Sequence, residues 1–169
     1  MDTDNELRSL STAIYYLLGY DRPDGLFHMN KSFASRSHLC LIFPDLGFEQ
    51  QTYHVLHQGR AEYTLITPVP GGPPKIEIKV MGIGPGEHRQ LLVGTGIWKK
   101  SRILPEDIAL GKSAEDKDRV GCLITEVVVP GFHWEDHVFM TKQKLEDLFR
   151  GVEGGESYIA AFEGYVKKD

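Results

Sequence analysis

Glycine and proline limit what this chain can fold into more than any other feature of its sequence. Eighteen glycines and nine prolines are spread over 169 residues and divide the chain into short segments. Both residues favour turns, glycine because it adopts conformations closed to other residues and proline because it lacks a backbone N–H group. The short runs between these breaks predict strands rather than long helices.

Several runs carry the pattern of a β-strand. Residues 75–80 of KIEIKVMGIG alternate charged and apolar side chains, which is typical of a half-buried strand, and residues 120–131 (VGCLITEVVVPG) are the most β-branched part of the chain. The segment TYHVLHQG is predicted to bend at Gly59–Arg60 and continue as AEYTLITPV. Further strands are predicted in residues 11–20 and 25–32, and twice in residues 89–104. Many short strands with frequent turns indicate an all-β sandwich or barrel.

Helix signals appear only near the end of the sequence. Thr141 precedes KQKLEDLFRG as a helix N-cap, Leu145, Leu148 and Phe149 share one face, and Gly151 ends the segment. Residues 111–119 (GKSAEDKDR) are predicted to form a solvated loop. The fold class expected is therefore all-β with a short C-terminal helix.

Charge and hydropathy exclude several classes of protein. The net charge is −5, so the basic surface that nucleic acids require is not expected. No apolar run approaches the roughly 20 residues that span a membrane, and the start MDTDNELRSL lacks the features of a signal peptide. Cys40 and Cys122 form no motif and are expected to be free thiols. We expect a cytoplasmic protein without a membrane partner.

Three stretches, taken in order, resemble one family: STAIYYLL and GLFHMNKS, then TYHVLHQGRAEYTLI, then VGCLITEVVVPGFHWEDHVFMT. They look like the small single-domain cupins of the Cupin-5 (RmlC-like) type, and VVPGF-x-x-x-D-H is the most specific motif. The resemblance covers roughly residues 8–149 and is nearest to the fungal branch. It implies a cupin jelly-roll barrel, usually a homodimer, with its site inside the mouth of the barrel.

The chain departs from that family in two places. Family members usually carry an H-P-E-G-G-x-Y/F motif on an earlier strand, and this chain starts after that point. Residues 33–51 also interrupt a part of the family pattern that is normally continuous. We therefore expect one cupin domain over residues 1–169, N-terminally short, with an insertion at about 33–51. A translated intron in the gene model would give the same sequence.

The resemblance raises the question of a metal. Metal-binding cupins use about three histidines and one carboxylate, a donor set that suits Fe, Mn, Ni or Zn. The matching positions here hold His28, Asn30, Thr52 and Lys99, and only the first of these is an ordinary ligand. No metal-binding residue is predicted, and the identity of any cofactor stays open. The segment GFHWEDH (131–137) is rich in histidine and acidic residues and also suggests a metal, but the resemblance implies that it forms a turn and a strand.

Strand geometry separates the two histidines of TYHVLHQG. Successive side chains of a strand point to opposite faces, so His54 and His57 cannot both face a barrel interior. If Thr52, His54 and Leu56 face inward, His57 faces outward or toward a partner, unless a bulge near Gly59 reverses the pattern. His54 is then either a core histidine with a satisfied hydrogen bond or a residue that contacts substrate.

Glu126 lies among β-branched residues, where a buried carboxylate needs a partner. Facing inward near His28 or His54, it would suit acid–base work; facing outward, it would be an ordinary strand residue. The predicted catalytic residues are His28, His54 and Glu126. The predicted substrate-binding residues are Asn30, Tyr63, Trp98 and Lys99; core packing is the alternative for Tyr63 and a surface position is the alternative for Lys99. Tyr15 is a further candidate for lining the barrel.

Two classes of function follow from these expectations. The resemblance includes cupin-domain oxidoreductases of fungal secondary-metabolite clusters, which make polyketides of the salicylaldehyde type. It implies an enzyme acting on a small-molecule intermediate, either as an oxidoreductase or as an acid–base isomerase or dehydratase. The alternative is a non-catalytic small-molecule-binding cupin or a dimeric scaffold. The incomplete ligand set favours acid–base chemistry over redox chemistry at a metal.

Overall fold

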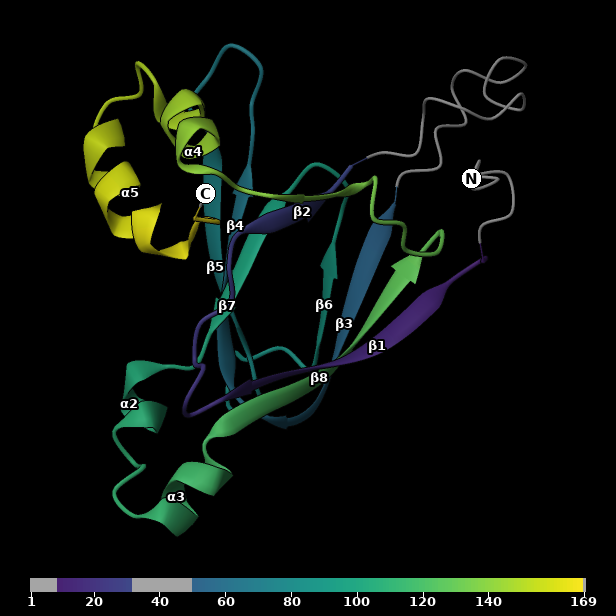
Figure 1. Ribbon diagram of the computed structural model, residues 1–169, viewed down its shortest axis with the longest axis vertical. Helices are drawn as coiled ribbons and strands as arrows, with labels where there is room; N and C mark the ends of the chain where they lie inside the picture. Colours follow the sequence, from purple (N-terminus) through teal and green to yellow (C-terminus); the bar gives the residue numbers. More distant parts are fainter. Residues whose placement is uncertain (1–8, 32–49, 169) are drawn as a thin grey trace.

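The computed structural model describes residues 9–31 and 50–168, which form two antiparallel sheets (Figure 1). The four-stranded sheet has the spatial order β1 (Thr12–Gly19), β8 (Gly121–Val129), β3 (Gln51–Gly59) and β6 (Gln90–Val93). The five-stranded sheet has the order β5 (Lys75–Met81), β4 (Ala61–Thr67), β7 (Trp98–Arg102), β2 (His28–Asn30) and β9 (His137–Phe139). This arrangement confirms the all-β prediction.

The chain crosses from one sheet to the other at Gly59, as the predicted bend requires. Strand β3 ends there and β4 begins two residues later in the opposite sheet. Gly59 has a φ of +79°, and a Cβ atom built on it would lie 1.7 Å from the carbonyl oxygen of Gly121. Only glycine accepts both the positive φ and the close approach of the β8 backbone.

Two hydrophobic cores lie on opposite sides of the five-stranded sheet. The first fills the space between the sheets and includes Tyr63, Leu65, Leu91 and Ile124. The second lies beneath the C-terminal helices and includes Phe27, Ile66, Trp98, Met140, Leu145 and Phe149. Strands β4 and β7 are therefore covered on both faces, and both are almost entirely buried.

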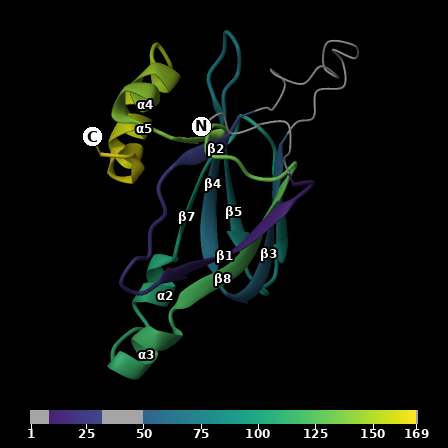
Figure 2. The ribbon, with the colours of Figure 1, turned by 45° about the vertical axis from the view of Figure 1, so that its right-hand side comes forward.

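The C-terminal helix prediction is confirmed, and a second helix follows it. Helix α4 spans Lys142–Phe149, its N-cap Thr141 accepts a hydrogen bond from the Lys144 amide, and Leu145 and Phe149 are buried. Helix α5 (Gly155–Phe162) and the 3₁₀ turn η1 (Glu163–Tyr165) continue the chain. Figure 2 shows these helices beside the five-stranded sheet.

The loop predicted at residues 111–119 is wrong in part, because residues 114–119 form helix α3 (Ala114–Arg119). Ser113 and Asp116 make a reciprocal capping box, in which each side chain accepts from the other's backbone amide. Such a box stabilises a short helix without any buried apolar face. Another short helix, α2 (Pro105–Ile108), also has no buried residue.

Some expectations concern residues outside the described part. The predicted insertion at 33–51 lies outside it except for its last two residues, Gln50 and Gln51, the second of which begins β3. Cys40 is outside it too, whereas Cys122 is a buried free thiol. None of the described helices is long and apolar enough to cross a membrane. The cytoplasmic location stays a prediction.

The prediction that side chains of β3 point alternately to the inner and the outer face is confirmed. Thr52 and His54 are buried, with exposed fractions of 2% and 0%, whereas Val55 and His57 are exposed. The register of β3 with β8 shifts between Leu56 and Gln58, so a bulge occurs, but it leaves His57 on the outer face. There His57 Nε2 lies 2.6 Å from Thr125 Oγ1, and its ring is 5.7 Å from that of Tyr15.

Candidate functional site

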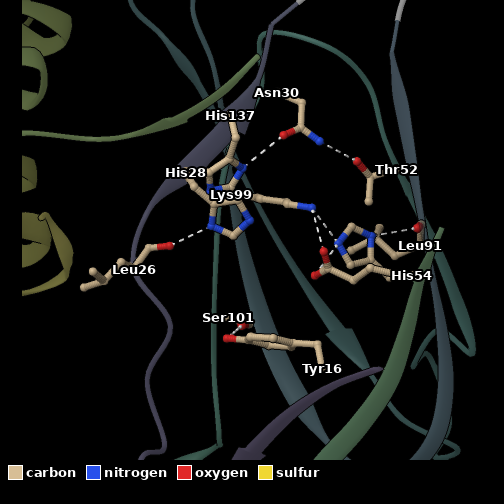
Figure 3. A network of polar contacts seen from close by, with 11 residues as sticks. Tyr16, Leu26, His28, Asn30, Thr52, His54, Leu91, Lys99, Ser101 and His137 are labelled. Atoms are coloured by element: carbon tan, nitrogen blue, oxygen red, sulfur yellow. Dashed lines mark hydrogen bonds and ion pairs between the residues drawn. The ribbon is translucent and has the colours of Figure 1, made fainter. Parts of the chain in front are cut away.

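Three ionisable side chains meet between the two sheets (Figure 3). Lys99 Nζ lies 2.9 Å from His54 Nε2 and 3.6 Å from Glu126 Oε2. His54 Nε2 lies 3.3 Å from Glu126 Oε1. Lys99 and His54 are almost completely buried, and the Glu126 side chain is 14% exposed. We refer to Lys99, His54 and Glu126 as the polar cluster; solvent reaches it at Glu126.

Strand register places these residues opposite one another. His54 on β3 and Glu126 on β8 are direct cross-strand partners in the four-stranded sheet. Lys99 on β7 is paired with His28 on β2 and with Leu65 on β4 in the five-stranded sheet. Paired residues of an antiparallel ladder share a face, so each sheet presents one polar pair to the other.

The hydrogen bonds of His54 define its protonation state. Nδ1 lies 3.2 Å from the carbonyl oxygen of Leu91, which can only accept, so Nδ1 carries the proton. Nε2 then has a lone pair that accepts from the Lys99 ammonium. Burial lowers the pKa of His54, and the nearby charge of Lys99 lowers it further. His54 is therefore a neutral imidazole that holds the ammonium of Lys99.

Lys99 and Glu126 compensate for each other's burial. Burial lowers the pKa of Lys99, while the charge of Glu126 acts to raise it. Burial acts to raise the pKa of Glu126, but the opposing influences, led by the charge of Lys99, lower it overall. Glu126 is thus a carboxylate whose negative charge depends on its neighbours.

Two further histidines lie on the β2 and β9 strands beside the polar cluster, with their rings 5.0 Å apart. His28 Nδ1 lies 2.9 Å from the carbonyl oxygen of Leu26, and His137 Nδ1 lies 3.2 Å from Asn30 Oδ1. Both Nδ1 atoms face oxygen acceptors, so each ring keeps a lone pair on Nε2. Burial, followed by the charge of Lys99, lowers the pKa of His28 to about 3 and also lowers that of His137. Both rings are neutral hydrogen-bond acceptors.

Asn30 links this pair to the opposite sheet, since its Nδ2 donates to Thr52 Oγ1 over 3.1 Å. On another side of His54, the ring of Tyr63 packs edge-on, with the two ring centres 5.3 Å apart. Tyr16 Oη and Ser101 Oγ lie 3.3 Å apart. Burial is the largest influence on both tyrosines and raises their pKa, so each hydroxyl stays protonated.

The structure brings most of the predicted site residues together. The three predicted catalytic residues share this region, as do Asn30, Tyr63 and Lys99. Trp98 does not join them, because it points to the other face of β7 and packs beneath helix α4, where Lys144 Nζ lies 5.9 Å from its ring centre. Tyr15 is 77% exposed and lies on the outer face of the four-stranded sheet. Glu126 faces inward, near His54, and is not an outward-facing strand residue.

The residues present do not fit the metal that the family resemblance suggested. His28, Asn30, Thr52 and Lys99 do approach one another, but Lys99 brings an ammonium group that repels a cation. Within residues 9–31 and 50–168, no group of three or more His, Cys, Asp or Glu side chains could hold a metal ion. The segment GFHWEDH lies within these residues, and in it His133 Nδ1 is 3.9 Å from Glu135 Oε2.

His137 was not among the predicted site residues, and neither were Tyr16, Thr52 and Ser101. His137 lies 107 residues from its hydrogen-bond partner Asn30. No local sequence pattern connects two positions so far apart. One signal was available: His137 belongs to the D-H pair that ends the most specific motif of the chain.

Comparison with known proteins gave a match to a family model and to individual proteins. The model described as Cupin superfamily (DUF985) matches residues 46–140. The uncharacterized protein YML079W of Saccharomyces cerevisiae is 34% identical over 159 residues, which cover 92% of this chain and 61% of that protein. The chain thus spans about three fifths of the length of this curated relative.

Solved structures share the fold at low sequence identity. Protein SO0799 from Shewanella oneidensis is similar with a TM-score of 0.64 at 16% identity, covering 100% of this chain and 82% of that one. A hypothetical protein from Leishmania major has a TM-score of 0.64 at 19% identity, covering 99% and 83%. A dTDP sugar isomerase from Desulfovibrio desulfuricans G20 has a TM-score of 0.52 at 7% identity, covering 83% and 71%.

Proposed function

This chain belongs to the cupin superfamily (DUF985), and on that premise we propose that it is an acid–base enzyme acting on a small-molecule carbonyl compound. The reaction would move a proton at the carbon next to the carbonyl group, as in an isomerase, an epimerase or a dehydratase. One observation carries this proposal: a buried ammonium, imidazole and carboxylate lie within 3.6 Å of one another in the polar cluster. Such groups supply general acid–base catalysis and stabilise a developing negative charge.

Substrate binding would redistribute the charges of the polar cluster. The Lys99 ammonium donates to the carbonyl oxygen of the substrate, where negative charge grows as the neighbouring carbon loses its proton. Glu126 then loses part of the attraction that holds its pKa down, and burial makes its carboxylate a stronger base. Glu126 accepts the proton, and His54 holds Lys99 in place through Nε2.

The neutral histidines His28 and His137 would orient the substrate. Each presents an Nε2 lone pair that accepts a hydrogen bond from a hydroxyl group. This favours a carbonyl compound that also carries hydroxyl groups, such as a hydroxyketone. One fold neighbour is described as a dTDP sugar isomerase, and sugar isomerisation belongs to the same class of reaction, although the shared fold does not by itself carry the assignment.

The resemblance to cupin-domain oxidoreductases of fungal polyketide clusters supports testing aromatic carbonyl compounds of the salicylaldehyde type as well. Under that alternative, an electron acceptor from outside this chain takes part. The polar cluster itself supports proton transfer, so the oxidoreductase function ranks second.

Deuterium exchange tests the proposal directly. Hydroxyacetone, dihydroxyacetone and a dTDP-linked keto sugar are incubated with the protein in D₂O, and loss of the proton signal next to the carbonyl is followed by NMR. We expect exchange above the buffer rate with at least one probe and its loss in Glu126→Gln. The matched control is Glu62→Gln, which removes a carboxylate paired with Arg102 elsewhere on the five-stranded sheet. Equal exchange in wild type and Glu126→Gln would reject the proposal.

A second proposal concerns assembly: we propose that two copies of this chain form a homodimer through the outer face of the four-stranded sheet. Ala13, Val127, Tyr53 and Leu92 form one apolar row across all four strands. Tyr15, Leu17, Val55, Leu92 and Val129 on this face are 77%, 66%, 37%, 49% and 39% exposed. Exposed apolar surface of this kind marks contact sites, and we refer to these five residues as the outer patch. A two-fold contact brings this face of one copy against the same face of the other.

A further inference from the structure

The amino group of Lys99 faces a base. His54 Nε2 lies 2.9 Å from Lys99 Nζ, and its lone pair points to the lysine because Nδ1 donates to the Leu91 carbonyl oxygen, 3.2 Å away. A nucleophile beside a base that is itself oriented by a third group is the usual arrangement for covalent catalysis. Glu126 Oε1, 3.3 Å from the same Nε2, would stabilise the imidazolium formed when His54 takes a proton.

We propose that Lys99 is a nucleophile that forms an imine with an aldehyde or ketone substrate. The inference rests on the proposed function for the class of substrate, a carbonyl compound, and goes beyond it in making the contact covalent. An iminium ion withdraws electrons from the neighbouring carbon more strongly than a hydrogen-bonded carbonyl does, so it makes the proposed proton transfer easier.

The steps balance without any further reactant. His54 Nε2 takes one proton from the Lys99 ammonium, which leaves a neutral amine and an imidazolium beside the Glu126 carboxylate. The amine nitrogen bonds to the carbonyl carbon, and the imidazolium returns its proton to the oxygen. The resulting carbinolamine loses water and gives the iminium ion. After proton transfer at the neighbouring carbon, water adds back and releases the product and the lysine.

Lys100, the next residue, shows why geometry selects Lys99. Lys100 is also buried and burial lowers its pKa to about 8, so it too has a reactive amine near neutral pH. Its Nζ points to the other side of β7, where it lies 3.8 Å from the ring centre of Tyr165 and 6.0 Å from that of Phe27. These aromatic rings hold a cation and offer no base. The two adjacent lysines therefore provide a matched comparison.

Pentane-2,4-dione is the first probe, because a neutral lysine amine condenses with it, with loss of one water, to give a stable enaminone that absorbs in the near ultraviolet. The protein is treated with this dione, digested, and mapped by mass spectrometry. We expect Lys99 of the wild type to be modified at least 10-fold faster than Lys100 or any other lysine. Mapping the wild type needs no variant, so the result does not depend on whether a substitution folds.

Variants then test the role of the base. Lys99→Arg should abolish the fast phase of enaminone formation and Lys100→Arg should retain it. His54→Asn, which keeps a polar side chain but removes the base, should slow modification of Lys99 by roughly 10². Modification spread evenly over the lysines, or absent from Lys99, would overturn the proposal, and so would an unchanged rate in His54→Asn that is shown by circular dichroism to be folded.

Reductive trapping separates this inference from the proposed function. Each of the three carbonyl probes used for deuterium exchange is incubated with the protein and with sodium borohydride, which reduces an imine to a stable secondary amine. A covalent adduct on Lys99 supports both proposals. Catalysed exchange with no adduct rejects the imine and leaves the proposed proton transfer standing. An adduct without catalysed exchange supports the nucleophile and rejects the isomerase chemistry.

Discussion

His54 and Glu126 are direct cross-strand partners on the inner face of the four-stranded sheet, with Nε2 of one 3.3 Å from Oε1 of the other. Lys99 reaches both residues from the opposite sheet. The site is thus built across the space between two sheets, and no single element contains it. The charge of Lys99 influences the pKa of both His54 and Glu126.

Glu126→Gln is expected to lower both activity and stability. The variant keeps the size of the side chain but leaves the buried ammonium of Lys99 without its counter-ion, and breaking a buried ion pair typically costs about 3–5 kcal/mol. Deuterium exchange should fall by roughly 10²–10⁴, and denaturant unfolding measures the loss of stability.

The control for this variant is Glu62→Gln. Glu62 pairs with Arg102, whose side chain is 34% exposed, so its loss should cost less than about 1 kcal/mol. Similar losses in the two variants would show that the polar cluster has no special electrostatic role.

His54 and His57 form a second matched pair, only three residues apart on one strand. His54→Asn should abolish catalysed exchange because it removes the acceptor that holds Lys99. His57→Asn should leave exchange within about twofold of wild type, because His57 lies outside and contacts Thr125. Rates of deuterium exchange for the two purified variants test this, and an inactive, folded His57→Asn would contradict it.

Stability should fall as the pH falls below about 6.5, the ordinary pKa of histidine. The pKa of each of His28, His54 and His137 is lowered in the folded protein, for His28 to about 3. The unfolded chain therefore binds protons that the folded chain does not, and the stability is fully present only above pH 6.5. Each histidine contributes a slope of up to about 1.4 kcal/mol per pH unit.

Thermal unfolding between pH 7 and pH 5 measures this slope. Glu126, whose pKa is also lowered, adds to it in the same direction at lower pH. His28→Gln should make the dependence shallower, since glutamine does not titrate. A Tm independent of pH over this range would contradict the neutral state assigned to the three histidines.

Gly59→Ala and Gly71→Ala separate backbone strain from a steric clash. Both glycines have a positive φ, +79° and +72°, but only Gly59 faces a backbone atom at its Cβ position. We expect Gly71→Ala to cost about 1 kcal/mol from strain, and Gly59→Ala to cost roughly 3 kcal/mol because β3 and β8 must also move apart. Equal values from chemical denaturation would show that the crossing between the sheets is not closely packed.

The proposed homodimer predicts that one introduced charge halves the mass of the particle in solution. Leu17→Glu places a carboxylate within the outer patch, on the face of β1 that points away from the polar cluster, and should convert a dimer into a monomer in light scattering. The control is Leu110→Glu at a residue that is 65% exposed near helix α2. A wild-type protein that is monomeric at all concentrations would reject the dimer.

The order and type of most strands could be predicted from the sequence, because alternation and turn residues are local properties of a chain. The same alternation placed His54 inward and His57 outward. It left both faces open for Glu126. The capping box of α3 was present in the sequence as Ser113 and Asp116, but the segment was predicted to be a loop because its composition is polar.

What the sequence determined by itself was which residues lie on the same face of each strand. What only the tertiary structure decided was which faces meet: that Lys99 points to His54 while Lys100 points to Tyr165, that Trp98 lies beneath a helix, and that His137 joins Asn30. The physical reason is that side-chain direction follows from the backbone within a few residues. Contact between sheets depends instead on register and packing between residues that are far apart in the chain.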